Sequence, residues 1–81
     1  MSKIPRVSGN HLIKYLVNKK GFQISHRKGS HVSLHNENKH KFTSVPSKND
    51  DLGTGLMLQI LSDCGINREE FISDYQSGLL K

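Results

Sequence analysis

The segment FQISHRKGSHVSLHNENKHKFTSVP, residues 22–46, determines the architecture, because its apolar residues recur at every second position. Val32 and Leu34 alternate with polar residues, which is the period of a strand with one buried face. Upstream, Phe22 and Ile24 alternate in the same way, and KFTSV at 41–45 has the composition of a third strand. The sequences RKG and NENK between these runs are typical of turns, and Pro46 suits the end of the last strand because it has no amide hydrogen to donate. The segment therefore predicts three antiparallel strands.

Two amphipathic helices flank the predicted strands. From residue 8 to residue 20, apolar side chains fall at i, i+1, i+4 and i+5, Ser8 is a suitable N-cap, and Gly21 follows as a helix terminator. Residues 56–64 repeat this spacing, and Gly65 follows them. The spacing predicts one helix before the strands and one after them.

A third, short helix is predicted near the C-terminus, because Asn67 and Glu70 form a capping-box pattern ahead of apolar residues at 71 and 72. The expected order is α-β-β-β-α with a helical tail. A three-stranded antiparallel sheet with helices on one face leaves its other face in water, which makes the fold class α+β. We expect residues 8–81 to form a single domain and residues 1–7 to form a flexible N-terminal segment.

The composition indicates a basic protein of a reducing compartment. The chain of 81 residues contains 12 Lys and Arg against 7 Asp and Glu, a formal charge of +5, which favours a polyanionic partner such as nucleic acid or an acidic protein. Cys64 is the only cysteine, so an intramolecular disulfide cannot form. The sequence has no apolar run of the length of a signal peptide or a membrane span. We therefore expect a cytoplasmic protein that does not enter the membrane.

Four of the five histidines lie between residues 26 and 40, which suggests a metal site, a solvated surface or acid–base chemistry. On a strand, His31 and His35 stand about 13 Å apart, so they cannot share a metal ion. Only a partner on another strand, such as His26, could complete a metal site. The solvated surface stays open as an alternative, and we expect no metal.

His31 is distinguished by its setting. It follows the sequence RKGS, in which Gly29 permits a tight turn and two cations, Arg27 and Lys28, could hold a phosphate. An imidazole titrates near neutral pH, so beside a phosphodiester it can remove a 2′-hydroxyl proton or protonate a 5′-oxygen without a metal. His31 is therefore the candidate catalytic residue.

The sequence SGNHLIKYLVNKKGFQISHRKGSHVSLHN, followed by VP and by ILSDCGI, resembles the HicA (YcfA-like) mRNA interferase toxins. In that family a double-stranded-RNA-binding-like α-β-β-β-α domain cleaves RNA, the essential histidine lies in a G-S-H motif, and a HicB antitoxin neutralises the toxin. The resemblance implies that His31 is catalytic and that Arg27, Lys28, Gly29 and Ser30 contact RNA phosphate. It implies a type II toxin that is a metal-independent endoribonuclease with no cofactor, and partners that are mRNA and a HicB-like antitoxin. The alternatives are a non-catalytic RNA-binding module and a protein that only binds its antitoxin.

Two features depart from the family pattern. The family usually has a histidine or similar residue soon after VP, where this chain has Ser47 and Lys48, and Leu58 replaces a usual arginine. We expect Leu58 either to weaken RNA binding or to contact a partner. Tyr15 could stack on a base from the outer side of the first helix, but we expect it to pack half-buried. Cys64 lies on an apolar stripe, and we expect it to pack in the core.

Overall fold

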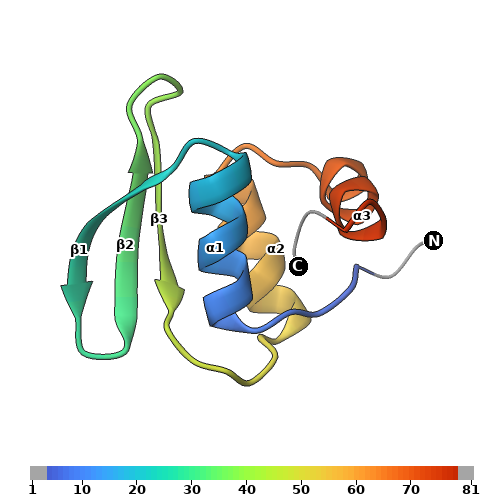
Figure 1. The fold of residues 1–81 in the computed structure, drawn as a ribbon, viewed down its shortest axis with the longest axis horizontal. Coiled ribbons are helices and arrows are strands. Elements are labelled where there is room, and N and C mark those ends of the chain that lie inside the picture. Colours follow the sequence, from blue (N-terminus) through green and yellow to red (C-terminus); the bar gives the residue numbers. More distant parts are fainter. Residues whose placement is uncertain (1–3, 79–81) are drawn as a thin grey trace.

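The computed structural model describes residues 4–78 and shows an antiparallel sheet with helices on one side (Figure 1). The elements are α1 (Gly9–Lys19), β1 (Gln23–Lys28), β2 (His31–Asn36), β3 (Lys41–Pro46), α2 (Thr54–Asp63) and α3 (Arg68–Gln76). The strand order is β1-β2-β3, and β1 is the strand farthest from the helices. The α+β fold and the element order predicted from the sequence are confirmed.

The helix ends follow the predicted signals. Ser8 caps α1 by accepting a hydrogen bond from the amide three residues later at 3.1 Å, and Asn67 caps α3 by accepting one from the Glu70 amide at 2.7 Å. Gly21 and Gly65 follow α1 and α2, as the sequence predicts. Local side-chain chemistry therefore sets where the helices begin and end.

The core lies between one face of the sheet and the helices. It consists of apolar side chains from β2, β3, all three helices and the connecting segments: Ile4, Val7, Leu12, Ile13, Tyr15, Leu16, Phe22, Val32, Leu34, Val45, Leu52, Met57, Ile60, Leu61, Cys64, Ile66 and Phe71. By contrast, all six residues of β1 are exposed. The β1 strand therefore projects beyond the helices, and both of its faces reach solvent.

The segment before α1 contributes to this core. We expected residues 1–7 to be flexible; residues 1–3 lie outside the described part of the chain, whereas Ile4 and Val7 are each only 6% exposed. The Arg6 side chain donates to the Leu52 carbonyl at 2.9 Å, and the Leu52 amide donates to the Val7 carbonyl at 2.8 Å. The two apolar side chains and these hydrogen bonds hold residues 4–7 against the loop before α2.

Helix α3 is attached to α1 through a polar cluster. The Tyr15 hydroxyl donates to Asp74 at 2.5 Å, and Lys20 pairs with Glu70 at 2.5 Å and with Asp74 at 2.8 Å. The Tyr15 ring also meets Phe71 edge to face at 5.6 Å. Burial and then the hydrogen bond to Asp74 raise the pKa of Tyr15 above its usual value. Tyr15 packs, as expected, but it is buried rather than half-buried because α3 covers it.

Helix α2 explains one departure from the family pattern. Leu58 is partly buried and packs against the core, so an apolar side chain suits this position, and the expected effect on RNA or partner binding stays a prediction. Cys64 is 1% exposed, as expected of a core residue, and burial raises the pKa of its thiol to about 12. The thiol therefore stays protonated and unreactive at neutral pH.

Candidate nucleic-acid interface and catalytic residue

His31 is the first residue of β2 and stands on the sheet face that the helices leave open. The burial of β2 alternates, with Val32 and Leu34 buried and His31 exposed. Its paired residues are Lys28 on β1 and Pro46 on β3, and paired residues of antiparallel strands project to the same face. We call this side of the sheet the open face; it carries His31, Ser33 and His35 together with the residues paired to them.

The Gly29–Ser30 pair forms a two-residue turn between β1 and β2. Gly29 has φ +59°, and among the described residues nothing lies within 4 Å of the position that a Cβ would occupy. Glycine is therefore required by the left-handed backbone and not by a close neighbour. The turn places Ser30 directly before His31 at the end of the hairpin, where both are exposed.

A bulge in β1 decides which cation lies beside His31. The register pairs Ile24 with Leu34 but His26 with Ser33, which leaves Ser25 as an extra residue. Without this insertion, strict alternation would place Lys28 on the helix side. With it, His26 and Lys28 lie on the open face, and the Cβ atoms of Lys28 and His31 stand about 5 Å apart.

Arg27 lies on the other face of β1. It is paired with Val32, whose side chain enters the core, and it lines a groove against the N-terminal half of α1. Asn10, His11 and Lys14 of α1 line the same groove. The structure therefore brings together His31 and Lys28, with Gly29 and Ser30 between them in sequence, and places Arg27 separately. The sequence signal for the groove is weak, because His11 and Lys14 are ordinary polar residues of a helix surface.

The Gly29–Ser30 turn is linked to the start of α1 through Ser47, which follows β3. The Ser47 amide donates to the Ser30 carbonyl at 2.5 Å, and the Ser47 hydroxyl bonds to the Asn10 side chain at 3.2 Å. Asn10 also donates to the Asn49 side chain at 2.6 Å. A Cβ on Gly9 would lie 1.7 Å from the Pro46 carbonyl oxygen, so only glycine allows this approach. Sequence reasoning missed the supporting roles of Asn10 and Ser47, although the S-G and V-P motifs mark the two segments that meet.

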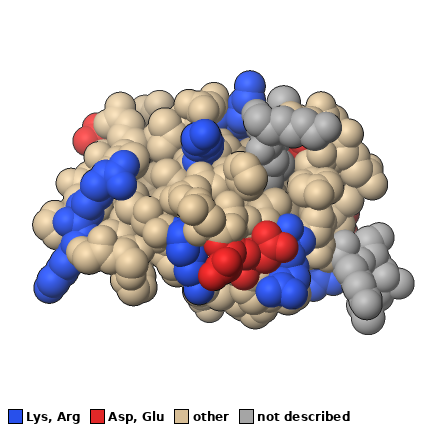
Figure 2. Space-filling model, turned by 60° about the horizontal axis from the view of Figure 1, so that its bottom comes forward, with Lys and Arg blue, Asp and Glu red and all other residues tan. Residues whose placement is uncertain are grey.

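The end of the β1–β2 hairpin is electropositive. Figure 2 shows Lys and Arg side chains gathered at the left end of the molecule, where the hairpin lies, with a small acidic patch above them and a larger one nearer the middle. None of the described strand residues on the open face is Asp or Glu. These residues are Gln23, His26, Lys28, His31, Ser33, His35, Phe42, Ser44 and Pro46. A phosphate would meet cations and hydrogen-bond donors here without a repelling carboxylate.

The other histidines of residues 26–40 are spread over the sheet. His26 is diagonal to His31 on the open face, His35 lies at the far end of β2, and His40 lies in the turn before β3. The His35 Nε2 atom is 3.8 Å from a Glu37 carboxylate oxygen. Within residues 4–78, no three His, Cys, Asp or Glu side chains are grouped closely enough to hold a metal ion. No helix in this range has the length and apolar character needed to cross a bilayer.

The sequence of this chain matches that of a known group of toxins. The sequence model of the family described as "HicA toxin of bacterial toxin-antitoxin" matches residues 9–66, which run from the first residue of α1 to just beyond α2. The chain belongs to the HicA toxin family. The match includes the Gly29–Ser30 turn, His31 and the α1 contacts to Ser47, whereas α3 lies outside it. A comparison with curated proteins finds no match.

The glycine and proline residues of the motifs that resemble the HicA family have structural roles in this chain. Gly9 and Pro46 are the residues at which α1 and the end of β3 touch, and Gly29 makes the turn that precedes His31. The Ser47 hydroxyl donates a hydrogen bond to the Asn10 side chain of α1. Ser47 therefore makes a polar contact next to the turn.

Proposed function

We propose that this HicA family member is an endoribonuclease that cleaves mRNA with His31 as its general acid or base. The observation that carries the proposal is the position of this imidazole: exposed, at the end of an electropositive hairpin, and directly opposite Lys28. Toxins of toxin–antitoxin pairs must act on a cellular target, and the open face suits a polyanion.

The chemistry is an attack of a 2′-hydroxyl on the neighbouring phosphorus, which yields a 2′,3′-cyclic phosphate and frees the 5′-oxygen. One group must accept the 2′-hydroxyl proton, and another must give a proton to the departing 5′-oxygen. His31 supplies one of these transfers, and His26, diagonal to it on the open face, is the candidate for the other. Lys28 offsets the charge that builds up on the phosphate oxygens.

The peptide groups of the Gly29–Ser30 turn and the Arg27 side chain would bind the RNA backbone on either side of the cleaved bond. Arg27 acts from the α1 groove, where Lys14 provides a second cation. Single-stranded RNA is the expected substrate, because a flexible strand can adopt the in-line geometry that attack by a 2′-hydroxyl requires.

An acidic, HicB-like antitoxin is the expected protein partner in the cytoplasm. Membership in a toxin–antitoxin family implies such a partner, and the charge of +5 favours an acidic one. We propose that the antitoxin covers His31 and excludes RNA. A neighbouring antitoxin that binds this chain but leaves its nuclease activity intact would contradict occlusion.

Incubation of purified protein with RNA in EDTA tests the proposal. We expect cleavage to continue in EDTA, since no step uses a metal, and we expect the products to carry cyclic phosphate and 5′-hydroxyl ends. Binding of RNA without cleavage would favour the alternative, a non-catalytic RNA-binding module.

A further inference from the structure

Phe42 is the most exposed of the large apolar side chains in the described chain, and neither the core nor the catalytic residues need it. It is 78% exposed, compared with 44% for Tyr75 and 39% for Ile24. It lies on β3 opposite His35, so its ring stands on the open face, at the end of the sheet away from His31. An exposed aromatic ring on the face that we propose binds RNA offers a flat surface on which a base can stack.

We propose that Phe42 is a stacking platform for one RNA base, which lies a few nucleotides from the cleaved phosphate. This inference rests on the proposed function, because it names a second contact of the same substrate. His31 and His35 are four residues apart on β2, so Phe42 stands about 13 Å from His31 along the sheet. An extended single strand that has its phosphate at His31 can therefore place a later base on Phe42.

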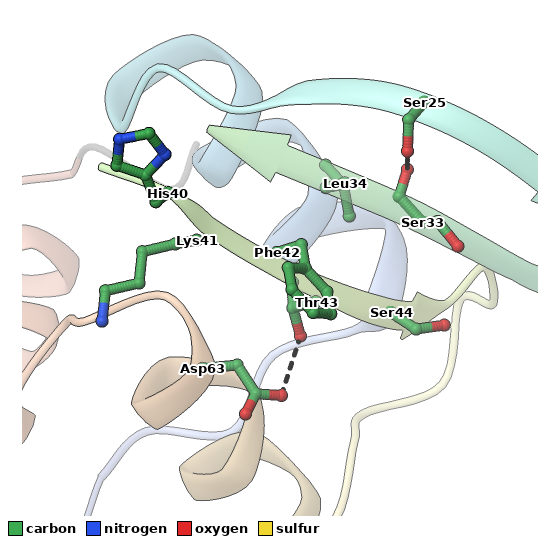
Figure 3. Close-up of a pocket in the computed structure, with 9 residues that line it drawn as sticks. All are labelled: Ser25, Ser33, Leu34, His40, Lys41, Phe42, Thr43, Ser44 and Asp63. Carbon is green, nitrogen blue, oxygen red and sulfur yellow. Dashed lines mark hydrogen bonds between the residues drawn. The ribbon is translucent and has the colours of Figure 1, made fainter. Parts of the chain in front are cut away.

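The surroundings of Phe42 suit a base better than a protein. The lining of the hollow beside it includes hydroxyl residues of all three strands, Ser25, Ser33, Thr43 and Ser44, and one further apolar residue, Leu34, which is buried (Figure 3). A protein interface centre would surround the aromatic ring with further apolar side chains. One ring among hydroxyl groups instead offers a flat surface for stacking and polar groups for the edge of a base.

Two carboxylates lie near Phe42, and both have partners on the protein. That of Glu37 lies 3.8 Å from the Nε2 atom of His35, the residue paired with Phe42. The hollow has one carboxylate in its described lining, Asp63, which comes from the end of α2 on the helix side. Its two oxygens already accept hydrogen bonds from Thr43 at 3.2 Å and from Gln59 at 3.0 Å. Figure 3 shows the Asp63–Thr43 bond beneath β3. Lys41 also lines the hollow, but from the helix side of β3, because it is paired with the buried Asn36 and its Cε atom lies near Gly65.

The test measures binding to RNA that is 2′-O-methylated throughout, because such RNA cannot be cleaved by its own 2′-oxygen. Base stacking on an aromatic side chain predicts that Phe42→Ala weakens binding about 5- to 140-fold. Phe42→Leu, which keeps apolar area without a ring, should be nearly as weak, and Phe42→Trp should bind at least as tightly as the wild type. Tyr75→Ala is the matched control, because Tyr75 is an exposed aromatic residue on α3 and should not affect binding.

A second arm locates the base. A set of oligonucleotides is used in which each lacks the base at a different position. The wild type should bind less tightly when the missing base is at one or two adjacent positions, whereas the affinity of Phe42→Ala should not change when these bases are missing. The thermal midpoint of Phe42→Ala should match that of the wild type, since the side chain is outside the core. Equal RNA affinity of Phe42→Ala and wild type would overturn the inference, and so would a loss that affects only antitoxin binding.

The outcomes also separate this inference from the proposed function. If RNA binding depends on Phe42 but unmodified RNA is never cleaved, the nuclease proposal fails and the stacking site stands. If unmodified RNA is cleaved with the same KM and kcat by wild type and Phe42→Ala, the stacking site fails and the nuclease proposal stands.

Discussion

Gly9→Ala should separate the start of α1 from the end of β3. The new Cβ would lie 1.7 Å from the Pro46 carbonyl oxygen, and real Cβ contacts are essentially never shorter than 3.0 Å, so the two backbones must part by more than 1 Å. The atoms that the new Cβ would meet belong to the backbone and cannot rotate aside. The shift would break the hydrogen bond from the Asn10 amide to the Lys48 carbonyl, now 3.1 Å long. Overpacking and the lost bond together predict a loss of about 2–4 kcal/mol in the free energy of unfolding.

Gly55→Ala is the matched control for this prediction. Gly55 also lies in the first turn of a helix, but among the described residues nothing is within 4 Å of the position that its Cβ would take, so alanine should stabilise the protein by about 0.5–1 kcal/mol. Urea denaturation followed by circular dichroism measures both changes. Since Ser47 links this junction to Ser30, Gly9→Ala should also slow RNA cleavage by the folded protein. Equal stability of Gly9→Ala and Gly55→Ala would refute the close approach.

Two further perturbations address the charges. RNA binding should weaken as the salt concentration rises, and Lys28→Ala and Arg27→Ala should each lower the slope of this dependence by roughly one unit or less. Lys28→Ala should lose more cleavage activity than Arg27→Ala, because of the two cations only Lys28 shares the face of His31. Unchanged affinity and slope in filter-binding titrations would remove both residues from the site. Burial raises the pKa of Asp74, but hydrogen bonds from Lys20 and Tyr15 outweigh it and lower the pKa below 3.8. The stabilisation by ionised Asp74 is therefore present above pH 3.8 and is lost as the pH falls further, so Asp74→Asn should be less stable than the wild type at pH 7 and the difference should shrink in acid. Urea denaturation of Asp74→Asn and the wild type at pH 7 and below pH 3.8 checks this. A stability difference between the two proteins that does not change with pH would contradict it.

The parts of the fold that follow from local patterns were predictable from the sequence. The alternation of Val32 and Leu34 fixed the buried face of β2, and the caps at Ser8 and Asn67 fixed two helix starts. Because alternation has a period of two, it also placed His31 on the open face without knowledge of the rest of the fold. The G-S-H resemblance pointed to the same residue.

The β1 bulge was not predictable, because no residue type signals it. Ser25 could occupy a regular strand, and the RKG sequence suggested that Arg27 and Lys28 lie in a turn together. The structure extends β1 to Lys28 and inserts Ser25, so the two cations face opposite sides. Contacts between distant segments, such as Gly9 with Pro46, likewise depend on how α1 packs and have no local pattern.

The most direct test of the nuclease proposal is the rate of RNA cleavage by purified His31→Ala. His31 is exposed, so its removal opens no core cavity and the fold should persist. General acid–base catalysis contributes typically 10²–10⁴-fold, and we expect a loss of about that size in EDTA near neutral pH, with the thermal midpoint and antitoxin binding retained. His35→Ala is the control: it shares the open face but stands about 13 Å from His31, so it should reduce the rate much less. Cleavage by His31→Ala at the wild-type rate, or a loss explained by unfolding alone, would contradict the catalytic role of His31.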